Sequence, residues 1–228
     1  MIKALYIAAS GMVAQSIKQD VIANNIANAQ TPGFKRKRAV EASFQQTLEK
    51  SVAIFEAGKK ASASPVLPVL AHAEAADDTS EGPVQSTGNP LNFAIQGTGT
   101  FEVGSGDAAR QTRNGSFIVD KDGELATSDG EKVQGKSGSI QMPKGEWTLT
   151  IDGTIVDAKG AEIDQIKIGG SEAGKTQVMQ GYLEQSNVNT IREMVDMIAN
   201  LRSYEANQKV ISSVDGTLDK LINEAGRV

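Results

Sequence analysis

The chain has 228 residues, 22% of them charged and 39% hydrophobic, so neither wholesale disorder nor a membrane-embedded protein is expected. It contains no cysteine and one histidine, His72, which excludes disulfides and cysteine-ligated metals and leaves little for nucleophilic catalysis. A net charge of −5 is too mild to indicate a nucleic-acid partner. Composition thus favours a protein without catalytic residues, cofactor or metal.

Residues 1–40 are expected to form an N-terminal helix followed by a turn. Apolar residues recur three or four positions apart from Ile2 to Val21, which predicts an amphipathic helix reaching about Asn28. Pro32 ends the helix, and Pro32-Gly33 favours a type II turn. The short apolar start contains Lys3 and is followed by polar residues, so neither a cleaved signal peptide nor a transmembrane helix is predicted.

Residues 41–82 are expected to form a short helix and an extended connector. Phe44, Leu48, Val52 and Phe55 have helical spacing. The stretch from residue 59 to 82 is rich in Ala, Ser and Pro and ends in an acidic patch, which is typical of a connector.

Residues 83–182 change to the pattern of a compact, mostly antiparallel β domain. Short β-prone runs, such as those at 101–103, 116–119, 147–151 and 163–168, alternate with glycine turns. Asn-Gly and Asp-Gly pairs between such runs are strong hairpin signals. They occur at Asn114-Gly115, Asp122-Gly123, Asp129-Gly130 and Asp152-Gly153.

Residues 183–228 return to a helical pattern. Thr190 and Glu193 have the spacing of a capping box at the start of a helix. The apolar stripe slips by one residue near Tyr204. It comprises Ile191, Met194, Ile198 and Leu201 before the slip, and Ile211, Val214, Leu218 and Leu221 after it.

Together these regions predict an α+β fold in which two long amphipathic helices flank an inserted β domain. Two paired helices usually leave apolar surface that needs further partners. Assembly into a polymer would satisfy that need.

Three sets of motifs resemble bacterial flagellar basal-body rod and hook proteins, and together they cover nearly the whole chain. The N-terminal motifs are DVIANNIAN at 20–28 and TPGFKR at 31–36. The central motifs are LNFAIQG at 91–97 and TRNGSF at 112–117. The C-terminal motifs are LEQSNVN at 183–189, EMVDMI at 193–198 and RSYEAN at 202–207.

The resemblance implies export through the flagellar type III apparatus and assembly into a helical tube. The terminal helices would form its inner layer and the β domain its outer layer. Implied partners are copies of the chain, other rod proteins, the export apparatus and the surrounding ring proteins. Asparagine amides at 24, 25 and 28 would set the register between subunits. The termini could also stay disordered until assembly. The expected assembly interface comprises Asn24, Asn25, Asn28, Thr31, Pro32, Gly33, Phe34, Asn187, Asn189, Ile191, Met194, Ile198, Leu201, Tyr204, Ile211, Val214 and Leu218.

Within the family, the β domain excludes the shortest members and the length excludes a typical hook protein. Two choices remain. The run from Thr87 to Leu91 favours a proximal rod protein with a β domain. The run from Ser203 to Asn207 also resembles a distal rod protein. A more distant alternative is a carbohydrate-cleaving β domain, which needs two paired carboxylates. Its candidate acids are Glu102, Asp107, Asp120 and Glu146.

Overall fold

The structure is a computed structural model that describes residues 2–40, 74–104, 109–143, 145–170 and 176–225. The chain divides into two compact units. We call Met1–Ala27, Lys37–Asp78 and Asn189–Val228 the helical unit, and Asn28–Arg36 with Thr79–Val188 the β unit. The predicted α+β class, with a β region between terminal helices, is confirmed. The short helix predicted near 41–58 lies outside the described residues.

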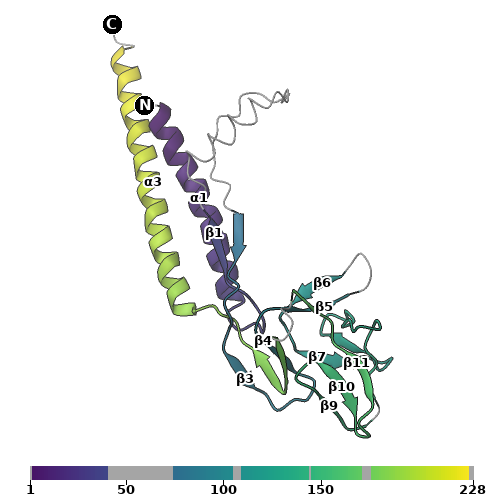
Figure 1. Cartoon of the computed structure of the whole chain (residues 1–228). Helices are drawn as coiled ribbons and strands as arrows, with labels where there is room; N and C mark the ends of the chain where they lie inside the picture. Colours follow the sequence, from purple (N-terminus) through teal and green to yellow (C-terminus); the bar gives the residue numbers. More distant parts are fainter. Residues whose placement is uncertain (1, 41–73, 105–108, 144, 171–175, 226–228) are drawn as a thin grey trace, which may run out of the picture. The chain divides into compact units, whose positions relative to one another are not determined.

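Two long helices lie side by side in the helical unit (Figure 1). Helix α1 spans Ile2–Ala27, and helix α3 spans Thr190–Ala225. Among the described residues, no helix is long and apolar enough to cross a lipid bilayer. Strand β1 (Lys37–Val40) lies against α1 and pairs in antiparallel fashion with β2 (Glu74–Asp77). Residues 74–77 of the predicted connector's acidic end therefore form a strand.

Helix α3 is capped differently from the sequence prediction. The Asn189 side-chain Oδ1 accepts a hydrogen bond of 3.1 Å from the Arg192 N–H, so Asn189 is the N-cap. The predicted capping box at Thr190 and Glu193 is wrong because the Glu193 carboxylate accepts a hydrogen bond from Asn25 on α1 instead. The Glu193 carboxylate thus makes a tertiary contact with α1 and does not take part in a capping box.

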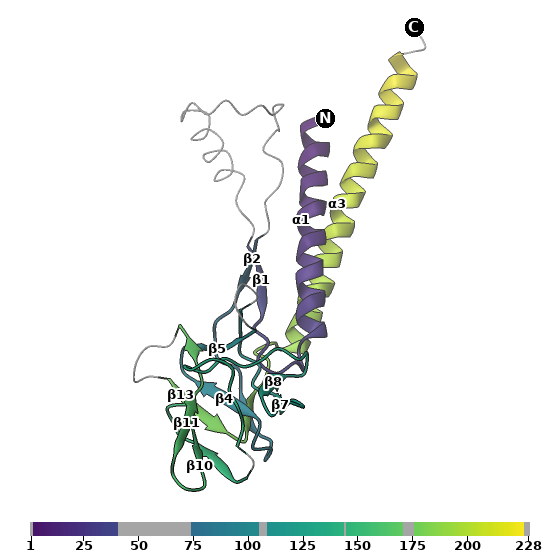
Figure 2. The same ribbon diagram turned by 90° about the vertical axis from the view of Figure 1, so that its right-hand side faces the viewer.

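The β unit consists of short antiparallel strands joined by tight turns (Figure 2). Its paired strands are β3 with β14, β4 with β13, β7 with β8, β5 with β6 and β12, and β10 with β9 and β11. Their bounds are β3 Val84–Ser86, β4 Phe93–Gln96, β5 Thr100–Val103, β6 Arg110–Thr112, β7 Phe117–Val119, β8 Leu125–Thr127, β9 Trp147–Leu149, β10 Thr154–Asp157, β11 Glu162–Gln165, β12 Ile168–Gly169, β13 Gln177–Gln180 and β14 Tyr182–Glu184.

Aromatic rings lie at the centre of the β unit's apolar core. Phe93, Phe101 and Phe117 are fully buried, and the Phe101 and Phe117 rings meet edge to face with centroids 5.2 Å apart. Trp147 packs edge-on against Phe93 at 6.1 Å. Such contacts add about 0.5–1.5 kcal/mol each beyond the burial of apolar area.

Three of the four predicted glycine turns are confirmed, and one is wrong. Gly123, Gly130 and Gly153 have positive φ angles at tight turns, with Gly123 joining β7 to β8 and Gly153 joining β9 to β10. Asn114-Gly115 does not close a hairpin, because β6 pairs with β5 and β7 pairs with β8. A Cβ at Gly115 would lie 1.7 Å from the Phe93 carbonyl oxygen, so this glycine permits a close backbone approach.

Candidate assembly interface

Helix α3 turns one face toward α1. Its polar members are Glu193, Asn200 and Asn207, which contact α1 directly. Residues at alternating intervals of four and three positions share this face, as in a heptad repeat. The whole set is Glu193, Met197, Asn200, Tyr204, Asn207, Ile211, Val214 and Leu218.

Side-chain amides join α1 to α3. The Asn200 Nδ2 group donates to the Gln15 carbonyl oxygen at 2.8 Å and to Gln19 Oε1 at 2.9 Å. The Asn207 Nδ2 group donates to Gln15 Oε1 at 3.2 Å and lies 3.0 Å from where a Cβ at Gly11 would be. Polar groups at such heptad positions specify register at a cost in stability.

A second, apolar face of α3 is exposed. Ile191 is 76% exposed and Ile198 54%, and Met194, Val195 and Leu201 share their side of the helix. At 3.6 residues per turn, this side lies about 130° around the helix from the face toward α1. We call these five residues the exposed α3 face. Large apolar side chains gathered this way on a surface mark an interaction site.

The two faces explain the slip that the sequence shows near Tyr204. Ile191, Met194, Ile198 and Leu201 belong to the exposed α3 face, whereas Tyr204, Ile211, Val214 and Leu218 are half-buried on the face toward α1. The slip is therefore a change of face. Polar residues occupy positions 193, 200 and 207 of the face toward α1. The apolar spacing of that face is therefore interrupted in the sequence.

Asn25 has partners within its own unit. It is 1% exposed, its Nδ2 donates to the Lys37 carbonyl at 2.9 Å, and its Oδ1 accepts from the Lys37 N–H at 2.9 Å. The same Nδ2 also lies 3.1 Å from Glu193 Oε2. This side chain thus ties α1 to both β1 and α3. A register role between subunits stays a prediction for the asparagines of this motif.

The predicted type II turn at Pro32-Gly33 is confirmed. The Phe34 N–H donates to the Thr31 carbonyl at 3.2 Å, and Gly33 has a φ of 70°. Thr31 also hydrogen-bonds Asn28 through its backbone N–H and its hydroxyl. Pro32 and Phe34 are half-buried, and Asn24 on α1 is exposed.

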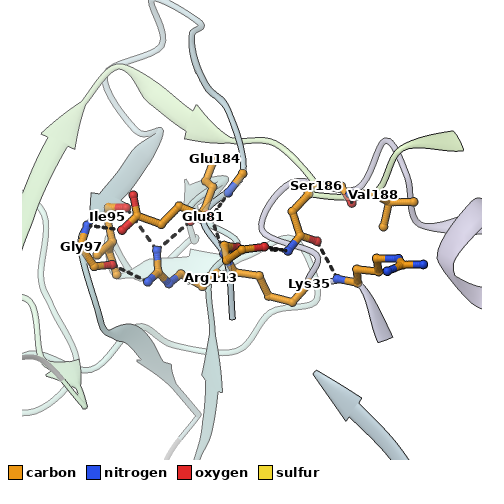
Figure 3. Close-up of polar contacts among 12 residues, drawn as sticks. Lys35, Glu81, Ile95, Gly97, Arg113, Glu184, Ser186 and Val188 are labelled. Atoms are coloured by element: carbon orange, nitrogen blue, oxygen red, sulfur yellow. Dashed lines mark hydrogen bonds and ion pairs between the residues drawn. The ribbon is translucent and has the colours of Figure 1, made fainter. Parts of the chain in front are cut away.

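A buried carboxylate lies close to this turn in the β unit. Glu184, which is 2% exposed, accepts from Lys35 Nζ at 2.6 Å and Arg113 Nη1 at 2.9 Å. The Gly82 N–H donates to it at 3.0 Å. Figure 3 shows the Lys35 and Arg113 side chains converging on Glu184. We call Lys35, Gly82, Arg113 and Glu184 the Glu184 cluster.

The Glu184 cluster holds its carboxylate in the charged form. Burial raises the pKa of Glu184, but hydrogen bonds from Lys35 and Gly82 and the positive charges of Arg113 and Lys35 outweigh burial and lower it. Sequence reasoning missed this cluster because its members lie far apart in the chain. The available signal was that each charged member lies inside a family motif.

Asn187, predicted as an interface residue, also makes contacts inside the β unit. Its Oδ1 accepts from the Arg36 N–H at 2.6 Å, and its Nδ2 donates to the Ser80 carbonyl and hydroxyl oxygens, both at 3.0 Å.

Within the described ranges, no group of three or more His, Cys, Asp or Glu residues could hold a metal ion. The contacts described above pack the helices against each other and hold distant chain segments together.

Three family models match the chain. The model described as flagella basal body rod protein matches residues 5–35, and the flagellar hook protein FlgE/F/G D1 domain matches residues 94–155. The flagellar basal body rod FlgEFG protein C-terminal model matches residues 179–224. The matches follow the order α1, β unit, α3.

Curated relatives match over almost the full chain. The flagellar basal-body rod protein FlgG of Bacillus subtilis is 32% identical, covering 98% of this chain and 99% of the relative. The FlgF protein of Escherichia coli K12 is also 32% identical, covering 91% and 92%. The FlgG protein of Caulobacter vibrioides is 32% identical, covering 95% and 97%.

These matches agree with a fold that has paired terminal helices, an inserted β unit and an exposed apolar helix face. The alternative of a carbohydrate-cleaving enzyme is excluded, because this family is structural and not enzymatic. Its members belong to the flagellar basal body and assemble with other rod proteins. The chain belongs to the flagellar basal-body rod protein family and is a structural subunit of the rod.

Proposed function

We propose that the chain polymerises with copies of itself and with other rod proteins into the helical shaft that transmits torque from the motor to the hook. The observation that carries this proposal is the exposed α3 face. Burial of a large apolar side chain contributes about 1.5–3 kcal/mol, so covering Ile191, Ile198 and Leu201 would favour association strongly. The helices would form the inner layer of the shaft and the β unit its outer layer.

The proposed position is the proximal rod. The run from Thr87 to Leu91 resembles the proximal protein that carries a β domain, and FlgF of E. coli has the same 32% identity to this chain as FlgG of B. subtilis, over 91% of the chain against 98%. The second candidate is the distal rod, which the relatives named FlgG favour. In either position the subunit would leave the cytoplasm through the flagellar export apparatus, without a cleaved signal peptide. It would then lie in the periplasm, inside the ring proteins.

Replacing Ile198 by Asp tests the exposed α3 face. A carboxylate in an apolar subunit contact costs far more than the same group in water, whereas Ile198 is exposed in the isolated subunit. We expect the variant to fold and be exported but not to complete rods, with motility lost. Electron microscopy of basal bodies and circular dichroism of the purified subunit are the measurements.

The matched control is Ser203→Asp, which adds the same charge at an exposed position on another side of α3. It should retain motility. Normal rods in the Ile198→Asp strain would contradict the proposed interface. An electron-microscopy map of the basal body then decides between the two positions, since density for this subunit next to the hook would refute the proximal assignment.

A further inference from the structure

The chain crosses between its two units four times, after residues 27, 36, 78 and 188. On the β-unit side, these crossings belong to three segments: Asn28–Arg36, the segment that begins at Thr79, and the segment that ends at Val188. Any force passed along the backbone from one unit to the other enters the β unit through these segments. The contacts of these three segments therefore decide how such a force is received.

All three segments are fastened to one another. Lys35 Nζ donates to the Ser80 carbonyl at 2.8 Å and to the Glu184 carboxylate, so one side chain joins all three. The Gly33 N–H donates to the Glu184 carbonyl at 2.8 Å, and Asn187 accepts from the Arg36 N–H. The Gln185 N–H donates to the Pro83 carbonyl at 2.9 Å.

Glycines let these segments approach closely. A Cβ at Gly82 would lie 1.9 Å from the Gln185 carbonyl oxygen. A Cβ at Gly33 would lie 2.3 Å from the backbone of Arg113 and of Asn114. At both positions a side chain would strike backbone, which cannot move aside as a flexible side chain can.

Arg113 connects these three segments to strand β4 and the residue that follows it. Besides the Glu184 carboxylate, its guanidinium donates to the Ile95 carbonyl at 3.2 Å and to the Gly97 carbonyl at 2.5 Å (Figure 3). Ile95 is a buried core residue of β4. A path of charge-assisted hydrogen bonds therefore runs from the connecting segments, through Glu184, to the core of the β unit.

We propose that the Glu184 cluster is a mechanical clasp. It binds the three connecting segments into one bundle anchored on the β unit, so that load reaches all three segments together and not one at a time. Glu184 acts as a positioning residue, because it holds Lys35 and Arg113 together. The mechanical part of the proposal rests on the proposed function in the rod.

The test is Glu184→Gln in the full chain, measured by amide hydrogen exchange. Glutamine keeps the shape of glutamate but removes the counter-charge of two partly buried cations, Lys35 and Arg113. We expect exchange to rise about tenfold or more in residues 28–36 and 79–83, with little change in the β7–β8 hairpin. Unchanged exchange in those two segments would overturn the clasp.

The matched control is Glu124→Gln. Glu124 is also buried, accepts a hydrogen bond from Ser139 at 2.6 Å and forms an ion pair with Lys132. Both partners are near Glu124 in the sequence and far in the sequence from the connecting segments. Its replacement should leave residues 28–36 unchanged. If both variants loosen those residues equally, the effect is general destabilisation and the clasp is refuted.

A milder variant covers the case in which Glu184→Gln does not fold. Lys35→Met removes one cation and leaves the pair of Glu184 with Arg113. Faster exchange confined to 28–36 and 79–83 supports the clasp, and unchanged exchange there overturns it.

Motility in media of rising viscosity then separates the clasp from the proposed function. With the clasp, Glu184→Gln cells build rods that fail as the load increases. If cells with loosened segments swim normally at every load, the mechanical role is refuted while the rod assignment stands. If deleting the whole chain leaves rods and motility intact, the proposed function itself fails.

Discussion

At the scale of single residues, a few polar side chains join parts of the chain that are distant in sequence. Asn25 matches both backbone hydrogen-bonding groups of Lys37, as a neighbouring strand would. Glu184 gathers two cations and a backbone N–H. Both groups are buried, so each must find partners or destabilise the fold.

The lowered pKa of Glu184 predicts a dependence of stability on pH. A group whose pKa falls on folding adds stability above its ordinary value, near 4.5, and that contribution disappears as pH falls through the folded-state value. The cations that face Glu184 are Lys35 and Arg113. We expect the difference in Tm between the natural chain and Glu184→Gln to be largest near pH 7 and to shrink below pH 4.5.

Trp147 fluorescence is the measurement, because this side chain packs against Phe93 in the β unit. Comparing the two proteins cancels other acids, including Glu124, whose pKa is lowered by hydrogen bonds from Lys132 and Ser139. A Tm difference that stays constant down to pH 3 would show that the charge of Glu184 is not what stabilises the fold.

At the scale of elements, α3 carries two kinds of surface along one helix. The face toward α1 uses amides for register, and the exposed α3 face is apolar. An ordinary amphipathic helix buries its apolar stripe inside the subunit. The first turns of α3 instead leave their apolar side chains exposed.

Two substitutions at Asn200 separate amide bonding from packing. Asn200→Asp has nearly the same shape but turns a carboxylate toward the Gln15 and Gln19 oxygens, and we expect it to destabilise the helical unit by about 2 kcal/mol. Asn200→Leu should be neutral or stabilising, because apolar residues at heptad positions pack well. Urea unfolding followed at 222 nm measures both. A loss of stability in Asn200→Leu with none in Asn200→Asp would mean that shape, and not the amide donor, matters.

The sequence predicted elements better than contacts. The periods of α1 and α3, the Pro32-Gly33 turn and three glycine turns are local signals, and the structure confirms them. The Asn114-Gly115 hairpin is wrong because the backbone of Gly115 pairs with Phe93, a non-local choice. The Glu184 cluster could not be derived, since no periodicity links residues 35, 113 and 184.

At the scale of the whole molecule, the two units differ in what holds them together. The β unit has a dry core of aromatic and aliphatic side chains. The helical unit joins α1 to α3 with amides, a buried glutamate and half-buried apolar side chains, and among its described residues the fully buried apolar side chains are Ala8 and Ile22. Because burial of apolar area is the larger stabilising contribution, the β unit should be the more stable of the two.

We therefore expect two separate thermal transitions. The helical signal at 222 nm should fall at a lower temperature than the fluorescence of Trp147, the single tryptophan of the chain, which reports on the β unit alone. Circular dichroism and fluorescence on one sample provide the comparison. Coincident transitions would show that the chain unfolds as one cooperative block.

The two faces of α3 also bear on how such proteins diverge. The side chains that define the subunit and those exposed on its outer face share a helix but share no residue. Substitutions on the outside can therefore change which neighbour is recognised while the protomer keeps its internal register. A duplicated gene could therefore acquire a new position in a polymer through a few codon changes on the exposed α3 face, while the contacts that fold the subunit stay the same.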